Sequence, residues 1–375
     1  MHCAHYAAAR CRSCGWLPTP YAAQLAAKQA QLGAMLVDAA VDWLPPVASA
    51  ETGFRNRAKM VVSGSAQMPR LGILDASGAG VDLEDCPLYP PALQAAFAPL
   101  RRLIRTAGIE PYSVPRRRGE LKYLLVTLAE DSGQLMVRFV LRSRAALPQL
   151  RKHLPPFTAE LPQVRVLTAN LQPVHQAVLE GPQEIMLGAY DALPLRLNAL
   201  TLWLGPQAFF QTNTAVAAAL YRQARAWVQA IDPPEVLDLY CGIGGFALHC
   251  ADGRRDVLGI EASAAAVALA RRGARDNRLE RLRFEAADAA QGSRALQSLP
   301  PLVIVNPPRR GLGAELCATL QASATRWLIY SSCNAESLAR DLATLPGFRV
   351  RRARILDMFP HTAHCEVLCL LERGA

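Results

Sequence analysis

The feature of this sequence that most restricts its fold is an alternation of short apolar runs with helical segments from residue 235 onward. The runs EVLDLY, DVLGIE, PLVIVN and RWLIYSS have apolar cores. Strands of this kind are buried on both faces, and the helices between them provide the crossovers that parallel strands need. We therefore expect an α/β fold in which helices cover both faces of a mainly parallel sheet. The last two runs, FRVRRARILD and EVLCLLE, are joined by a short loop, which predicts an antiparallel final pair.

The first half of the chain has a different pattern. Residues 20–40 have apolar positions at helical spacing, whereas LKYLLVTLAE and LMVRFVLRS alternate as strands do and are bounded by Gly, Pro or Ser. The segment PALQAAFAPLRRLIRTAG predicts a helix between such strands, and residues 214–230 predict another, capped by Thr212 or Asn213. We expect three domains: a cysteine-bearing segment with a helix (1–45), a β-rich central domain (46–204) and the α/β domain (205–375).

Composition limits the class of partner. The chain has 41 Lys and Arg against 31 Asp and Glu, a net charge of +10, which suits a polyanion, although a solvated surface explains the same charge. No apolar stretch is long enough to cross a bilayer, and the initial segment MHCAHYAAARCRSC lacks the apolar region of a secretory signal. We expect a cytoplasmic protein that acts as a monomer, away from the membrane.

A glycine loop, CGIGGF, follows EVLDLY and leads into a helix. Gly242 and Gly244 let the backbone approach a ligand at the carboxyl ends of the strands. Glu261 closes the next strand, where a carboxylate can accept hydrogen bonds from ribose hydroxyls, and Asp288 closes the third, where it can meet an adenine amine. The loop also fits the loose dinucleotide fingerprint, so NAD is an alternative. The aspartate before the loop and the Cys-Gly-x-Gly-Gly spelling favour S-adenosylmethionine (SAM).

The run PLVIVN leads into Asn306-Pro307-Pro308-Arg309. Two prolines fix the backbone just beyond the fourth strand, where a target base is expected to meet the methyl donor. Enzymes that methylate exocyclic amines carry an aromatic residue after this Asn-Pro-Pro. Arg309 stands in that place, which argues against that class.

Two residues at strand ends have the chemistry for methylating a pyrimidine ring. Cys333 ends the fifth strand in SSCN, and Glu366 begins the last strand. A thiolate suits attack on an electron-poor alkene carbon, and its addition to carbon 6 of uracil makes carbon 5 nucleophilic. A general base must then remove the carbon-5 proton. These residue types predict Cys333 as nucleophile and Glu366 as base, while Cys365 is expected only to pack.

Four cysteines in the first quarter of the chain suggest a metal site. Cys3, Cys11 and Cys14 form a Cys-x(7)-Cys-x(2)-Cys run, and Cys86 lies in EDCPLYP. Disulfides are not expected in the cytosol. Four thiolates suit either a [4Fe–4S] cluster or zinc, although structural zinc more often uses two Cys-x(2)-Cys knuckles.

In chain order, FFQTN, LYCGIGGF, GIE, NPPRRG, SSCN and FPHTAHCE resemble the RNA uracil carbon-5 methyltransferase family over residues 205–375. The resemblance implies a Rossmann-like class I SAM methyltransferase domain. Most members carry Asp where this chain has Asn306, and an amide cannot take up a proton as a base does. The resemblance implies SAM contacts at Gln211, Tyr240, Glu261 and Asn306, with Cys333 as nucleophile and Glu366 as base.

The resemblance also bears on the metal and the substrate. Ribosomal-RNA members carry a [4Fe–4S] cluster and transfer-RNA members do not, so the four cysteines are expected to bind such a cluster. No small β-barrel domain precedes Cys3, and the chain is most similar to members that methylate uracil 747 of 23S ribosomal RNA. The target is expected in a single-stranded loop. The rivals are a transfer-RNA uracil methyltransferase and a non-catalytic iron–sulfur RNA-binding protein, which would need no Cys–Glu pair.

Two basic segments, GFRNRAKMVVSG and PRRRGELKYLLV, resemble the family's central region. Phe54 or Tyr123 is available there to stack on a base. For each basic residue, ordinary surface charge is the alternative to a phosphate contact. The residues expected to contact phosphates are Arg55, Arg57, Lys59, Arg116, Arg117 and Arg118.

Overall fold

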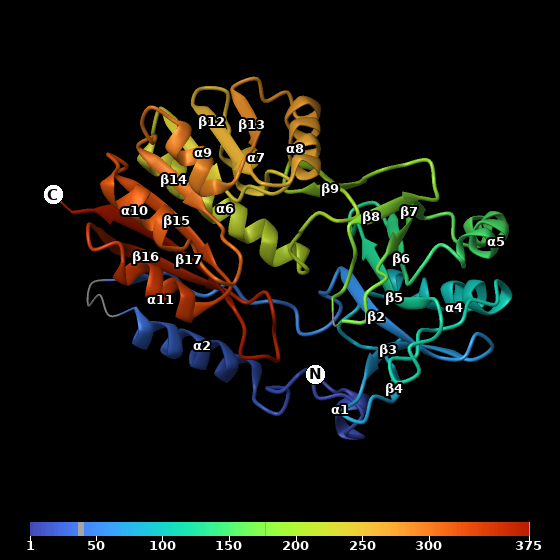
Figure 1. Ribbon diagram of the computed structural model, residues 1–375. Helices are drawn as coiled ribbons and strands as arrows, with labels where there is room; N and C mark the ends of the chain where they lie inside the picture. Colours follow the sequence, from blue (N-terminus) through green and yellow to red (C-terminus); the bar gives the residue numbers. More distant parts are fainter. Residues whose placement is uncertain (37–40, 177, 375) are drawn as a thin grey trace. The chain divides into compact units, whose positions relative to one another are not determined.

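The computed structural model describes residues 1–36, 41–176 and 178–374, which form two compact units (Figure 1). The N unit comprises Met1–Cys14, Glu51–Leu195 and Gly205–Gln207. The C unit comprises Gly15–Ala50, Arg196–Leu204 and Ala208–Ala375. Each of the three domains expected from the sequence is one continuous stretch of the chain, whereas each unit is built from several stretches. Residues 15–45 accordingly belong to the same unit as the carboxyl-terminal fold.

The C unit contains an eight-stranded sheet with the order β1-β16-β17-β15-β14-β11-β12-β13. Its centre is parallel, and β17 runs antiparallel to both β15 and β16, as the short final loop predicted. The strands are β1 (Asp42–Trp43), β11 (Glu235–Leu239), β12 (Asp256–Glu261), β13 (Leu282–Ala286), β14 (Leu302–Val305), β15 (Trp327–Ser332), β16 (Phe348–Leu356) and β17 (Glu366–Arg373).

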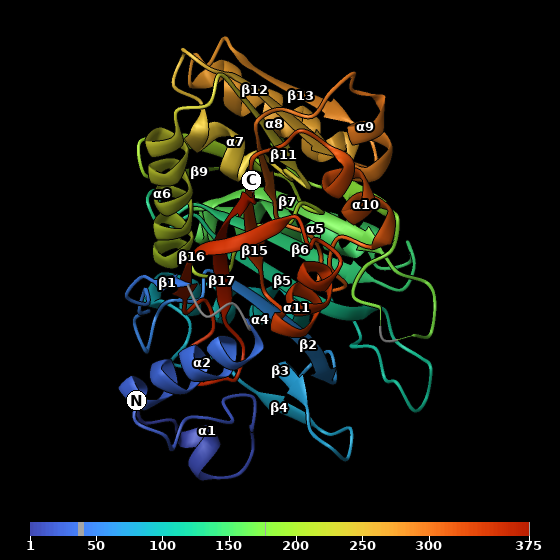
Figure 2. The ribbon, with the colours of Figure 1, turned by 90° about the vertical axis from the view of Figure 1, so that its left-hand side faces the viewer.

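Helices cover both faces of this sheet (Figures 1 and 2). Leu32 of α2, Leu316 of α10 and Leu338 of α11 pack in one cluster with Leu239 and Val305 of the strands. Helices α6, α7 and α8 lie on the other face. The helices are α2 (Tyr21–Met35), α6 (Thr214–Ile231), α7 (Gly245–Cys250), α8 (Ala264–Asp276), α9 (Ala289–Ala295), α10 (Ala314–Ala322) and α11 (Ala335–Ala343).

The N unit contains a seven-stranded sheet with the order β4-β3-β2-β5-β6-β7-β8. Among the described strand pairs of this sheet, β6 and β7 alone run parallel, because α5 provides the crossover between them. Helices α3, α4 and α5 pack on one face against residues such as Met60 and Leu124. Strands β9 (Leu193–Leu197) and β10 (Leu200–Leu204) form a separate sheet. The other elements are α1 (Ala4–Ala7), β2 (Arg57–Gly64), β3 (Pro69–Leu74), β4 (Gly80–Asp82), α3 (Pro91–Gln94), α4 (Phe97–Thr106), β5 (Leu121–Leu128), β6 (Leu135–Leu141), α5 (Leu147–Glu160), β7 (Val164–Leu171) and β8 (Gln183–Met186).

Three helices differ in detail from expectation. The predicted helix over 91–108 is broken between α3 and α4, because Pro99 has no N–H to donate and is tolerated only in the first turn of a new helix. Helix α2 ends at Met35, and residues 37–40 of that prediction lie outside the described residues. Asn213 rather than Thr212 caps α6, by accepting from the Val216 N–H at 3.2 Å.

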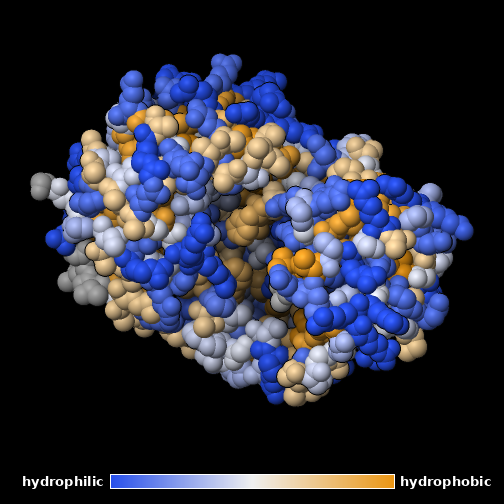
Figure 3. Space-filling view, in the orientation of Figure 1, coloured by the Kyte–Doolittle hydropathy of each residue, from blue (hydrophilic) through white to orange (hydrophobic). Residues whose placement is uncertain are grey.

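Within the described ranges, no helix has the length and apolar character to cross a membrane. On the face shown in Figure 3, hydrophilic residues predominate over both units and apolar residues occur in small groups.

Candidate active site

The glycine loop after β11 has a backbone that only certain residues adopt without strain. Gly242 and Gly244 have φ of +56° and +87°, and Tyr240 is also left-handed at +61°. A Cβ on Gly244 would lie 2.8 Å from Cζ of Phe284, whereas one on Gly242 would meet nothing within 4 Å. Gly244 is therefore required by packing, and Gly242 borders open space in which a ligand can lie.

Two carboxylates stand at the carboxyl ends of the neighbouring strands. Glu261 Oε2 accepts from the Gly242 N–H at 3.2 Å and Oε1 from the Ser263 N–H at 2.9 Å, which fixes the carboxylate against the loop. Asp288 caps α9 through one oxygen, Oδ1, which accepts from two backbone N–H groups. Both side chains keep acceptor capacity for a nucleoside at this edge of the sheet.

Asp238 supports the loop from inside the core. It is fully buried, and its Oδ2 accepts from the Ala247 N–H in α7 at 2.9 Å. Burial, and to a smaller extent the charge of Glu261, raises the pKa of Asp238 to about 8. Burial thus favours the neutral form of this side chain, which is suited to hold the helix rather than to face solvent.

Gln211 and Tyr240 complete the predicted SAM contacts. Gln211 is buried, two residues before the cap of α6. Tyr240 is half-buried, and burial together with the charge of Asp288 raises its pKa, so these two side chains are neighbours. Tyr240 thus lies at the start of the glycine loop and beside Asp288.

The Asn-Pro-Pro-Arg loop after β14 lies beside the cysteine segment. Asn306 begins it, and its N–H donates to Leu239 O at 3.4 Å. Asn334 Nδ2 donates to Arg309 O at 3.0 Å, which ties this loop to the residue after Cys333. The Arg309 side chain is close enough to Cys333 to lower the pKa of its thiol.

Strand register brings the predicted nucleophile and base together. Ser332 pairs with Val367 in the antiparallel ladder of β15 and β17, so Cys333 follows one strand directly opposite Glu366 on the other. Burial raises the pKa of the Cys333 thiol, the charge of Glu366 raises it further, and Arg309 opposes both. The thiol is therefore protonated in the free protein at neutral pH.

Glu366 is buried with 1 % of its surface exposed, and Ser331 Oγ donates to its Oε1 at 2.5 Å. Burial raises the pKa of Glu366 to about 7, although the bond from Ser331 lowers it. A carboxyl group with this pKa can accept and release a proton at physiological pH. Ser331 was not predicted; strand alternation, which places it on the same side as Cys333, was the available signal.

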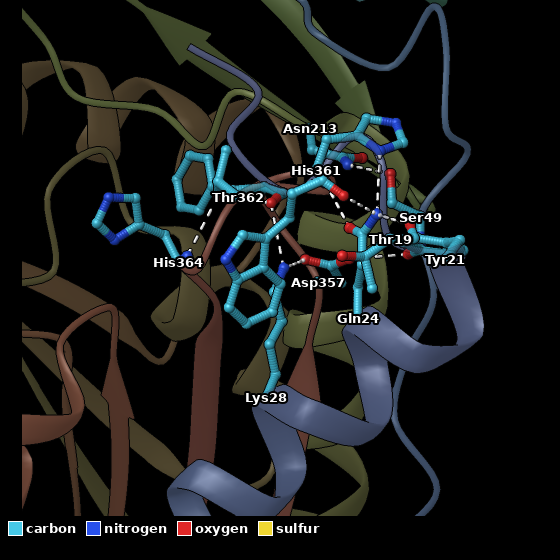
Figure 4. Close-up of polar contacts among 12 residues, drawn as sticks. Thr19, Tyr21, Gln24, Lys28, Ser49, Asn213, Asp357, His361, Thr362 and His364 are labelled. Atoms are coloured by element: carbon cyan, nitrogen blue, oxygen red, sulfur yellow. Dashed lines mark hydrogen bonds and ion pairs between the residues drawn. The ribbon is translucent and has the colours of Figure 1, made fainter. Parts of the chain in front are cut away.

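The loop between β16 and β17 is held by a buried polar network from α2 (Figure 4). Lys28 and Asp357 are both fully buried, with Nζ 2.6 Å from Oδ1, and Lys28 also donates to Phe359 O at 3.2 Å. Gln24 accepts from the His361 N–H at 2.8 Å. His361 has a left-handed φ of +66°. This network fixes the segment that leads into Glu366.

Removing one partner of this ion pair is expected to destabilise the protein. Lys28→Met leaves Asp357 buried without its cation, and such changes cost about 3–5 kcal/mol. The free energy of unfolding from denaturant titration measures the loss, with Lys152→Met on the exposed face of α5 as control. A loss below about 1 kcal/mol for Lys28→Met would show that the pair is not the anchor of the loop.

The four amino-terminal cysteines lie in the N unit and are half-buried. Residues near them are folded together, since His5 Nε2 and Asp85 Oδ1 are 2.5 Å apart. Burial raises the pKa of both Cys14 and Cys86 to about 11, and the thiols of Cys3 and Cys11 contribute to each shift. The four thiols are thus neighbours, but among the described residues no three His, Cys, Asp or Glu side chains are placed to bind one metal ion.

The predicted RNA-contact residues differ in their exposure to solvent and in their hydrogen bonds within the protein. Arg57 is half-buried, its Nε donates to Thr127 Oγ1 at 3.0 Å, and burial lowers its pKa to about 10. Arg55 is half-buried and donates to Arg57 O, whereas Lys59 and the run 116–118 are exposed. Phe54 has only 7 % of its surface exposed, so it is not available to stack, which corrects that expectation.

The sheet order and the site at its carboxyl edge define a class I SAM methyltransferase fold. The crystal structure of Pyrococcus abyssi tRNA (uracil-54, C5)-methyltransferase in complex with S-adenosyl-L-homocysteine superposes with a TM-score of 0.80 and 26% identity, covering 96% of this chain and 85% of that one. The sequence model of the tRNA (Uracil-5-)-methyltransferase family matches residues 192–374.

Curated relatives are similar over the full length. The 23S rRNA (uracil(747)-C(5))-methyltransferase RlmC of Halothiobacillus neapolitanus is 53% identical over 100% of both chains. Proteins of the same name from Edwardsiella ictaluri and Escherichia coli O157:H7 are 52% and 51% identical, over 100% and 99% of each chain. The chain belongs to the family of RNA uracil carbon-5 methyltransferases, as its motifs predicted.

Proposed function

We propose that this protein transfers a methyl group from SAM to carbon 5 of the uracil that corresponds to position 747 of 23S ribosomal RNA. The observation that carries the proposal is that Cys333 and Glu366 adjoin the Ser332–Val367 pair of β15 and β17 and influence each other electrostatically, beside the Asn306–Arg309 loop. The relatives that are 51–53% identical over essentially the whole chain bear the name of that activity. It acts in the cytoplasm, where ribosomal RNA is made in bacteria.

The residues at the glycine loop fit SAM. Gly242 leaves open space at its Cα, and Glu261 and Asp288 present carboxylate oxygens at the ends of adjacent strands. SAM, when bound, supplies an electrophilic methyl group on a sulfonium. Glu261 is suited to hold the ribose hydroxyls, and Asn306 and Gln211 can donate and accept hydrogen bonds without changing charge. Tyr240, Gly244 and Asp288 are the other residues that we expect to contact SAM.

Cys333 starts the reaction by bonding to the target ring. Its sulfur adds to carbon 6 of uracil, and the electron pair of the 5,6 double bond moves into the ring as an enolate. Because the free thiol is protonated, it must lose its proton to solvent as the uracil enters the site, and Arg309 is the cation whose charge favours the thiolate. Carbon 5 of the enolate then bonds to the methyl group as the bond from the methyl group to the sulfonium sulfur breaks, which leaves a neutral thioether.

Glu366 ends the reaction by removing the carbon-5 proton. That electron pair re-forms the double bond, the bond from sulfur to carbon 6 breaks, and the Cys333 thiolate is released. Ser331 orients the carboxylate through its hydrogen bond. The buried position of Glu366 keeps its pKa near 7, high enough for a useful base at neutral pH.

The test is methylation of ribosomal RNA by the purified protein. Fragmented, unmethylated 23S ribosomal RNA is incubated with isotope-labelled SAM and mapped by mass spectrometry, with transfer RNA as a parallel substrate. We expect label on carbon 5 of the uracil at position 747, in a single-stranded loop where extrusion of the base costs least. Label found only in transfer RNA, or in neither, would overturn the proposal.

We also propose that Cys3, Cys11, Cys14 and Cys86 bind a [4Fe–4S] cluster. The support is that four half-buried thiols from distant parts of the chain influence one another's pKa in a single unit. In a four-iron cluster each thiolate binds a different iron, so its ligands stand farther apart than those of a single ion. The cluster would join residues 1–14 to the rest of the N unit, and no step of methyl transfer passes through it.

Protein purified without oxygen is expected to contain about four irons per chain. Because thiolates must replace thiols whose pKa is raised, cluster binding releases protons and weakens as the pH falls. Iron and zinc analysis measures the content, with Cys11→Ser as the test variant and Cys369→Ser as a matched change outside the set. Stoichiometric zinc without iron under iron-replete conditions would contradict the assignment.

A further inference from the structure

A pocket with aromatic walls lies in the N unit, on the sheet face opposite its helices. Met60 and Leu124 pack with the helices, so Val61 and Tyr123, which pair across β2 and β5, point to the other face. The cavity there measures about 320 Å³, within the size range of small-ligand sites. Its lining residues, of which none among those described is acidic, are Val61, Leu74, Tyr112, Val114, Lys122, Tyr123, His175 and Gln176.

A buried lysine holds the walls in place. Lys122 is 6 % exposed; its Nζ donates to Gln172 Oε1 and, at 2.7 Å, to Val174 O. The same Nζ stands 4.7 Å from the centre of the Tyr112 ring, and Tyr112 Oη lies 2.8 Å from His175 Nδ1. Lys122 has no carboxylate partner in the described part of the chain, so its positive charge is met only by neutral oxygens and a ring. A flat, electron-rich ligand is therefore favoured over a cation.

The rim of the pocket carries an exposed basic segment of the N unit. Tyr112 N–H donates to Leu121 O at 2.8 Å and Ser113 N–H to Arg118 O at 2.7 Å, which closes a tight hairpin. Val114, a lining residue that is 48 % exposed, lies in this hairpin just before the exposed arginine run 116–118. Cations beside aromatic rings are the combination that binds unpaired nucleotides, phosphate on the cations and base on the rings.

We propose that this pocket, which we call the tyrosine pocket, binds one unpaired nucleobase of the substrate RNA, distinct from the target uracil. The base stacks on Tyr123, because the Tyr112 ring already meets the Lys122 Nζ, while the exposed edge of the base meets His175 and Gln176. The neighbouring phosphates contact the arginines at 116–118. The inference rests on the proposed RNA substrate, and it gives that substrate a second point of recognition.

The experiment uses the full-length protein and hairpin RNAs that contain the target loop, with 2-aminopurine placed at one loop or flanking position at a time. Stacking quenches this fluorescent base, so one position other than the target uracil is expected to be quenched on binding. Tyr123→Leu keeps apolar volume but removes the ring, and should abolish that quench and weaken RNA binding about tenfold, within the range for losing one stacked base. His175→Ala, which removes an exposed side chain, should weaken binding in the same direction.

Tyr190→Leu is the matched control, because Tyr190 is also an exposed aromatic of the N unit, under the Arg165 guanidinium at 4.1 Å. It should retain the quench and the RNA affinity of the unchanged protein. If Tyr123→Leu and His175→Ala both bind RNA normally with the quench intact, the pocket serves another ligand, such as a protein segment, and the proposal is wrong. The assay measures RNA binding independently of methylation. A protein that shows the quench but transfers no methyl group would contradict the proposed function and leave the tyrosine pocket supported.

Discussion

Replacing Cys333 with alanine is expected to abolish methyl transfer while leaving SAM binding intact. Without sulfur addition at carbon 6, carbon 5 of uracil is too weak a nucleophile, so the rate should fall by more than about a thousandfold. SAM affinity should not change, because the glycine loop and Glu261 lie on other strands. Single-turnover transfer of labelled methyl to RNA measures the first quantity, and calorimetric SAM binding measures the second.

Cys365→Ala is the matched control for this variant. Cys365 is the other half-exposed cysteine of the C unit among the described residues, and it packs against the core. Its replacement should leave most of the activity. Substantial methylation by Cys333→Ala would mean that the reaction proceeds without this nucleophile.

Replacing Glu366 with glutamine is expected to stop the reaction one step later. The amide can still accept from Ser331 Oγ but cannot take the carbon-5 proton, so methyl transfer should occur once and the enzyme should remain bonded to RNA. RNA tritiated at carbon 5 separates the steps, since the variant should incorporate methyl without releasing tritium. A denaturing gel should show the adduct on natural uracil. Normal tritium release would assign the proton to another base.

The same residue predicts the pH dependence. Glu366 must be ionised to act, so the elimination rate should rise with pH through about 7, and protonation of Cys333 adds to the loss on the acid side. The free energy of unfolding changes in the opposite direction. Because the pKa of Glu366 in the folded protein is about 7 and its ordinary value is 4.5, the protein loses stability as the pH rises from about 4.5 to about 7. Glu366→Gln should therefore be more stable than the unchanged protein at pH 8, by on the order of 1–3 kcal/mol.

Much of the C unit could be predicted because its candidate site residues lie at the ends of strands. Apolar runs mark β11, β14 and β15, and the residues just after them fall at one edge of a parallel sheet. Which of those residues lie opposite one another could not be predicted from their spacing in the sequence. The opposition of Cys333 and Glu366 follows from the register of β15 with β17, and register is a tertiary property.

Contacts between distant segments were also beyond prediction. Lys28 lies in an amphipathic helix whose spacing suggests only a packed face, yet its charge meets Asp357 in the core. The single helix predicted over 91–108 was wrong, because Pro99 cannot donate a backbone hydrogen bond inside a helix, and apolar periodicity does not report this. Likewise, the chain order of segments does not reveal that residues 15–50 join the carboxyl-terminal fold.

Peptide mapping of a trapped complex tests the central claim most directly. A hairpin RNA with 5-fluorouracil at the target position cannot lose fluorine as a proton, so addition and methyl transfer should end in a stable adduct. Digestion and mass spectrometry are expected to find one nucleotide, methylated at carbon 5, joined through carbon 6 to the peptide that contains Cys333. An adduct on any other residue, or no adduct from protein that methylates natural RNA, would contradict the mechanism.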